Sequence, residues 1–108
     1  MAKQIEIIKA EAWIDTMPIQ PTPGGTLHVI ADINGNGRRA HLVKKVPQGI
    51  NPLILMLEIR LSLTDEYVKN PQHLTYVEHL QSTKQYETIE IYFENKKLKE
   101  ITDIPIVT

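Results

Sequence analysis

Leu53-Ile-Leu-Met-Leu-Glu-Ile-Arg-Leu-Ser-Leu63 carries an aliphatic residue at every second position, the spacing of one face of a β-strand. The other face is apolar at Ile54 and turns polar from Glu58 onward. A helix is the alternative, because leucine, methionine, glutamate and arginine favour helices. Helical geometry would place Arg60 about 200° from Glu58 and scatter the polar side chains. The pattern therefore predicts a central β-strand whose first half is covered on both faces.

Length, charge and composition limit the class of protein. The 108 residues fit one domain, and we expect a single β-sandwich domain over residues 1–108. The formal net charge of −1 gives no overall attraction to nucleic acid or to an anionic membrane. Without cysteine there are no disulfides, thiolate nucleophiles or cysteine-based zinc sites. The longest aliphatic run, residues 53–57, is too short to span a bilayer, so we expect a cytoplasmic protein without a membrane segment.

Upstream of the central stretch, the chain predicts a strand, a loop and a hairpin. Residues 3–14 alternate, but the parity of the apolar positions changes near Ile7, which predicts a β-bulge. Residues 17–25 hold three prolines and two glycines and form a loop. Residues 26–33 alternate cleanly, and the Asn-Gly-Asn-Gly that follows is typical of a hairpin turn. Residues 38–46 are therefore predicted to return antiparallel to that strand.

The remaining segments complete an all-β pattern. Residues 46–52 form a connector with two prolines and a glycine, and residues 86–94 and 98–104 alternate as strands. Residues 73–80 fit a strand or a short helix, and we take a strand. About seven strands at this spacing predict a single antiparallel β-sandwich of immunoglobulin-like architecture, without the cysteine and tryptophan signature of antibody domains.

One segment imitates a calcium-binding loop. Asp32-Ile-Asn-Gly-Asn-Gly37 matches the first half of an EF-hand loop. The twelfth position, where calcium needs a bidentate glutamate, is Val43, and two arginines follow the glycine. We therefore interpret the segment as a turn whose asparagines and glycines adopt positive φ angles.

The histidines give little support to a metal site. His73 and His79 lie six residues apart, which is about 20 Å along a strand and too far to share one ion. Only His28 and His41 could meet, beside Asp32, if the predicted hairpin forms. Two such histidines on a solvated face more often simply contact water than bind an ion, so no metal or cofactor is predicted.

Catalytic and nucleic-acid signals are also weak. The only serines are Ser62 and Ser82, and neither lies in a G-x-S-x-G motif, so no catalytic residue is predicted. A basic cluster in residues 38–45 lacks interleaved aromatic residues, which makes weak nucleic-acid binding the less favoured alternative. Its members are Arg38, Arg39, His41, Lys44 and Lys45.

Binding through loops or strand edges is the remaining function class. Proline-rich loops present a fixed surface at low entropic cost, and two such loops flank the strands near the ends of the sandwich. The main hypothesis is a non-enzymatic module that binds a protein partner or a second copy of itself, and the alternative is a small-ligand or metal-binding sandwich. The candidate binding residues are Trp13, Pro18, Pro21, Pro23, Gln48 and Asn51.

Overall fold

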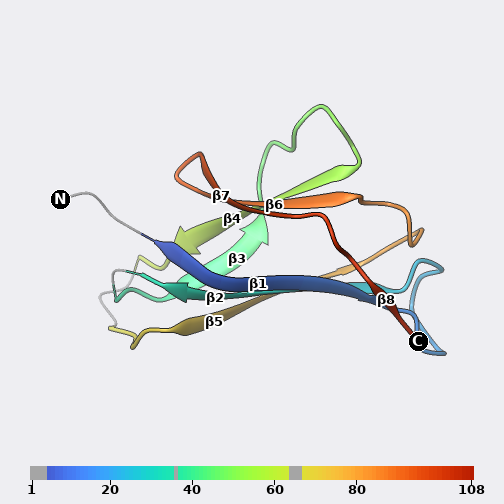
Figure 1. Ribbon diagram of the computed structural model, residues 1–108, viewed down its shortest axis with the longest axis horizontal. Helices are drawn as coiled ribbons and strands as arrows, with labels where there is room; N and C mark the ends of the chain where they lie inside the picture. The colour runs from blue at the N-terminus through green and yellow to red at the C-terminus, as the bar shows by residue number, and fades with distance from the viewer. Residues whose placement is uncertain (1–4, 36, 64–66) are drawn as a thin grey trace.

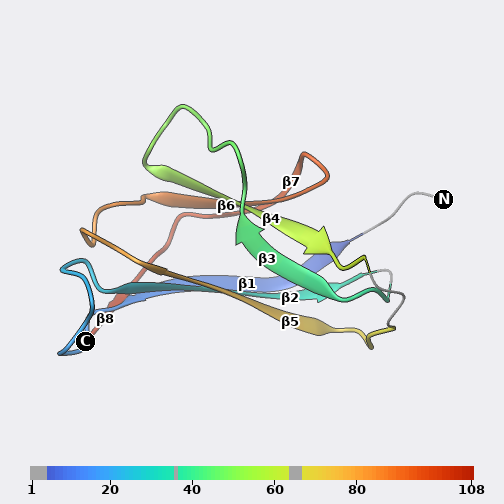
Figure 2. The same ribbon diagram turned by 180° about the vertical axis from the view of Figure 1, so that it is seen from behind.

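A computed structural model describes residues 5–35, 37–63 and 67–108 of the chain. Two four-stranded β-sheets face each other in a sandwich-like arrangement (Figures 1 and 2). Within these residues there is no helix long and apolar enough to cross a membrane. The strands are β1 (Glu6–Asp15), β2 (Thr26–Asn34), β3 (Ala40–Lys44), β4 (Ile54–Leu61), β5 (Gln72–His79), β6 (Thr88–Phe93), β7 (Lys96–Ile101) and β8 (Ile106–Val107).

The two sheets are mixed rather than purely antiparallel. One has the order β5-β2-β1-β8 and the other has the order β3-β4-β6-β7. The pairs β1–β8 and β4–β6 are parallel, which corrects the expectation of an antiparallel sandwich. A parallel pair needs a long connection, and the chain provides one because β5 lies between β4 and β6 in sequence but belongs to the other sheet.

The predicted central strand is confirmed. β4 lies between β3 and β6, and its inward residues Leu55, Leu57 and Ile59 are buried. Leu53 and Leu63, at the two ends of the alternating stretch, lie outside the strand and are exposed. Alternation therefore identified the face of the strand, whereas its length was set by the partners on either side.

β2 also follows the predicted faces, with one exception. Leu27, Val29, Ala31 and Ile33 are all buried between the sheets. Thr26 belongs to the alternate set of positions, which the sequence pattern places on the outward face, yet it is buried. Its hydroxyl donates to Gln20 Oε1 at 2.7 Å, so the preceding loop folds over it.

The predicted hairpin between residues 26–33 and 38–46 is wrong. β2 pairs with β1 and β5, and β3 pairs with β4 in the opposite sheet. Val29 accordingly lies opposite Ala12 and Tyr76, and not opposite a residue of β3. Both strands still bury alternate side chains, because a chain that crosses between facing sheets keeps its apolar residues inward on both. Asn36, in the predicted turn, is outside the described residues.

The other local predictions hold with shifted boundaries. The register of β1 against β2 shifts between Ile7 and Lys9, which confirms the bulge. Residues 72–79 form a strand, β5, so the ambiguous segment is not helical. β6 and β7 are joined by a turn in which Glu94 and Asn95 have φ angles of 49° and 66°, the conformation of a tight primed hairpin turn.

Candidate interaction sites

The segment between β3 and β4, residues 46–53, stands clear of the sheets (Figure 1), and we call it the proline arch. Gln48 holds it in place. Its Oε1 accepts a hydrogen bond from the Met56 N–H at 2.9 Å, and its Nε2 donates to the Met56 carbonyl at 2.8 Å. The same Nε2 donates to the Lys45 carbonyl at 2.5 Å. The side-chain amide therefore continues the hydrogen bonding of β4 where β3 has ended.

Asn51 anchors the other end of the arch. Its Oδ1 accepts from the Leu53 N–H at 3.0 Å, and its carbonyl accepts from the Ile54 N–H at 3.2 Å. Between these two anchors, Ile50 is fully exposed, with a relative accessibility of 103%. Val46 is also largely exposed. The arch thus holds aliphatic side chains in water on a backbone that is hydrogen-bonded at both ends.

A hollow of about 440 Å³ lies beside the arch. Its walls include Ile50 and Leu53 of the arch, and Tyr86 and Lys44 from outside it. The exposed side chain of Ile50 therefore stands next to this hollow. Protein interfaces commonly pair a protruding side chain on one partner with a pocket on the other.

The second proline-rich loop, residues 16–25, lies elsewhere. Figures 1 and 2 show it at the end of the molecule near β8, apart from the proline arch. Gly24 N donates to the Leu80 carbonyl at 2.9 Å, and Leu80 N donates to the Gly25 carbonyl at 2.8 Å. The loop is therefore tied to the segment after β5 and not to residues 46–53.

The predicted binding residues are consequently split between two places. Trp13 lies on β1, half-buried, and stacks on His28 of β2 with ring centroids 5.3 Å apart. The three prolines of the second loop, Pro18, Pro21 and Pro23, are exposed near the end of the same sheet. Gln48 and Asn51 belong to the proline arch, where their side chains bind the protein's own backbone.

On one side of the molecule β3 of one sheet lies beside β5 of the other. Glu78 of β5 accepts hydrogen bonds from the Tyr76 hydroxyl at 2.5 Å and the Tyr86 hydroxyl at 2.6 Å. Lys44 Nζ of β3 lies 3.7 Å from the same carboxylate. Burial, followed by the hydrogen bond to Glu78, raises the pKa of both tyrosines. This polar cluster joins the two sheets on this side.

On the opposite side β1 lies close to β7. Among the described residues no strand pairing joins β1 to β7, and we call this the open side for that reason. In the part of the chain that the structure describes, only Ile14 and Asp15 of β1 have a partner on the edge that faces away from β2, and that partner is β8. Residues 10–13 pair with β2 alone. The main chain of β1 therefore has a free edge along this stretch.

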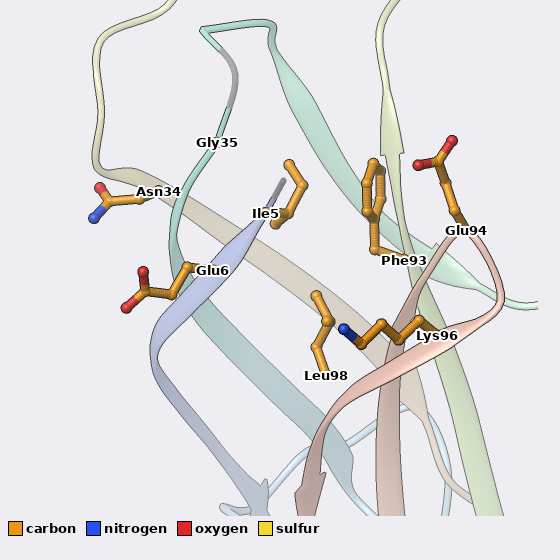
Figure 3. A pocket seen from close by; sticks show the side chains of 8 residues that line it. All are labelled: Ile5, Glu6, Asn34, Gly35, Phe93, Glu94, Lys96 and Leu98. Atoms are coloured by element: carbon orange, nitrogen blue, oxygen red, sulfur yellow. The ribbon is translucent and has the colours of Figure 1, made fainter. Parts of the chain in front are cut away.

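Two hollows lie along the open side. The larger, about 660 Å³, is bounded by the start of β1 and by the turn between β6 and β7. Figure 3 shows Ile5, Phe93 and Leu98 turned toward it, whereas the carboxylate of Glu6 points away. The second hollow, about 500 Å³, lies between residues 10–13 of β1 and the end of β7.

The structure does not gather the residues of the other candidate sites. His28 and His41 lie in different sheets, because the hairpin that would have joined them does not form. Instead His73 Nδ1 lies 2.6 Å from Asp32 Oδ1. Among the described residues no group of three or more histidines and carboxylates could hold a metal ion. Lys45 of the basic cluster lies over the ring of Tyr92 at 5.8 Å.

Comparison with protein-family models, curated proteins and solved structures finds no match to the chain. Function is therefore inferred from the site geometry. The open side of β1 was missed from the sequence, although Ala10 and Ala12 gave a signal. Small side chains at successive inward positions of a strand indicate that a neighbour lies close or that a hollow remains.

Proposed function

We propose that this chain is a non-enzymatic protein-interaction module that binds its partner through the proline arch. The single observation that carries the proposal is the full exposure of Ile50 between two backbone anchors. An aliphatic side chain in water gains about 25 cal/mol for each Å² of apolar area that a partner buries.

The anchors matter as much as the exposed side chain. A loop that is already ordered loses little conformational entropy on binding, so more of the contact energy appears as affinity. Gln48 and Asn51 supply this order from inside the arch, through bonds to Met56, Lys45 and Leu53. In this proposal both are positioning residues, and Ile50 and Val46 touch the partner.

The two sheets act as the frame. Loops on a rigid β framework commonly carry binding, as in immunoglobulin-like sandwiches, and the same plan is proposed for this chain. The hollow beside the arch, between Leu53 and Tyr86, would receive a side chain of the partner while Ile50 enters a pocket on the partner's surface.

The test uses two matched aliphatic-to-acid substitutions. Ile50→Asp places a charge at the tip of the arch, and Leu63→Asp makes the same kind of change at a side chain that is 95% exposed elsewhere. Wild type and both variants are immobilised and compared for proteins captured from the source organism's lysate. Sedimentation velocity on each variant measures self-association.

Ile50→Asp should weaken capture or self-association by about tenfold or more, whereas Leu63→Asp should leave it unchanged. Equal binding by both variants would show that the arch is not the contact. Thermal melting confirms that the substitutions leave the fold intact, because surface changes of this kind are usually within about 0.5 kcal/mol of neutral.

A further inference from the structure

The free edge of β1 has already accepted one extended segment of its own chain. Ile14 N donates to the Pro105 carbonyl at 2.9 Å, and Thr16 N donates to the Val107 carbonyl at 2.8 Å, so β8 adds to β1 in parallel. The addition stops after two residue pairs, because the chain before Pro105 turns away to β7 in the other sheet.

The alternating direction of main-chain groups along a β-strand identifies which N–H and C=O groups of β1 remain unpaired. N–H and C=O groups of every second residue point to the same edge. Since Ile14 and Thr16 donate toward β8, the main-chain groups of Ala10 and Ala12 point to the same edge, beyond the end of β8. The bulge between Ile7 and Lys9 ends the regular stretch on the other side. About four residues, or about 13 Å, remain available.

A hollow accompanies this edge. The 500 Å³ cavity is lined by Ala10 and Ala12 on the β1 wall and by Ile101 on the β7 wall. Alanine side chains leave space that a larger residue would fill. A strand added next to β1 would direct alternate side chains into this space, facing the same way as the alanines.

We propose that residues 10–13 of β1 bind an extended segment of another protein, which adds to the sheet as a strand in line with β8. The segment carries aliphatic residues at the positions that face Ala10 and Ala12, and basic residues at the alternate positions. Recognition is by main-chain hydrogen bonds together with the hollow, so this site is separate from the proline arch and has a different chemistry.

Charge around the hollow selects this occupant. Its lining includes Glu11, Glu100 and Asp103 against a single lysine, Lys99. Lysines outside the hollow pair with Glu11 at 3.5 Å and with Glu100 at 3.2 Å, but exposed pairs of this kind contribute little and exchange readily. A basic segment therefore finds carboxylate partners.

A second copy of the chain fits this edge less well. Antiparallel pairing of two β1 strands about a two-fold axis at Glu11 would set the two Glu11 carboxylates side by side, and like charges directly opposite are destabilising. The same symmetry would bring two acid-rich hollows together. This register disfavours a second copy, and the proposed occupant is a different polypeptide.

The probe is the peptide Lys-Val-Lys-Val-Lys-Val-amide with fluorescein on its N-terminal amine, titrated with the full chain and followed by fluorescence polarisation. Three control peptides separate the contribution of the main-chain hydrogen bonds from that of charge. One carries methyl groups on the backbone nitrogens of the valines, one carries them on the backbone nitrogens of the lysines, and one has glutamate in place of lysine. One of the two N-methylated peptides should bind about tenfold more weakly or worse, since it lacks the N–H groups that face β1. The glutamate peptide should also bind more weakly.

Two variants test the site itself. Ala12→Pro removes an N–H that points to the free edge and not to β2, and Ala10→Phe fills the hollow. Both should reduce probe binding about tenfold, whereas Ile50→Asp in the arch should leave it unchanged. In the wild type, bound probe should slow hydrogen exchange at the Ala10 and Ala12 amides.

Absence of saturable binding by the probe would overturn the proposal, as would equal binding by all the peptides. If Ala12→Pro does not fold, Ala10→Phe and the N-methylated peptides decide the outcome. Probe binding that is lost in Ile50→Asp and kept in both alanine variants would place the peptide at the arch and refute an edge site.

Discussion

Replacement of Gln48 by alanine should destabilise the protein far more than its surface position suggests. The side-chain amide makes three hydrogen bonds, to the Lys45 carbonyl and to both backbone groups of Met56. At about 1 kcal/mol net for each bond, the variant loses about 2–3 kcal/mol of unfolding free energy. For a chain of this length, about 4 °C per kcal/mol corresponds to a fall in Tm of about 8–12 °C.

The matched control is Gln81→Ala, at an exposed glutamine in a turn, and it should stay within about 0.5 kcal/mol of the wild type. Gln48→Glu keeps the size of the side chain but cannot donate to the two carbonyls, so it should be at least as damaging as the alanine variant. Urea denaturation followed by circular dichroism measures all three. Equal stability of Gln48→Ala and Gln81→Ala would refute the idea that this amide replaces strand backbone.

Three further predictions concern the core, the tyrosine cluster and the tryptophan. Leu57→Asp should abolish folding, and Glu58→Gln should have little effect. An unpaired carboxylate in the core costs several kcal/mol, whereas the whole free energy of unfolding of a domain is about 5–15 kcal/mol. Similar melting curves for the two variants would contradict the face assignment. Because burial and Glu78 raise the pKa of Tyr76 above its ordinary 10.0, the unfolded state loses this proton first, so unfolding free energy should fall as pH rises above 10. Tyr76→Phe should flatten that fall, and an unchanged slope in alkaline urea titrations would disprove the assignment. Iodide should quench Trp13 only partly, since its ring is half-buried against another ring; quenching equal to that of free indole would contradict the stacking.

The faces of the strands could be predicted from the sequence because a buried face requires an apolar residue at every second position of the strand. Alternation at Leu55, Leu57 and Ile59 indicates a strand and its inner face, whichever strands lie beside it. The same is true of Val29 and Ala31 in β2. Side-chain period, bulge and turn chemistry all act over a few residues, so one sequence contains them in full.

Strand partners could not be predicted in the same way. Val29 and Leu42 are both inward residues, and an adjacent hairpin and a crossing between sheets give the same alternation. The Asn-Gly signal favoured the hairpin, yet both edges of β2 are taken by β1 and β5. The role of Gln48 was equally hidden, because a glutamine that bonds to backbone has the same local sequence as one in solvent.

The parallel pairing of β1 with β8 has a consequence for the order in which the protein forms. Ile14 and Asp15 pair with Ile106 and Val107, some ninety residues later in the chain. During synthesis, the edge of β1 stays wholly bare until the ribosome has released the last of these residues. Contacts so distant in sequence also slow folding, into the range of milliseconds to seconds that is typical of β proteins. A nascent chain therefore passes through an interval in which this edge is longer than in the finished fold, and in that interval it is most exposed to aggregation or to capture by a chaperone.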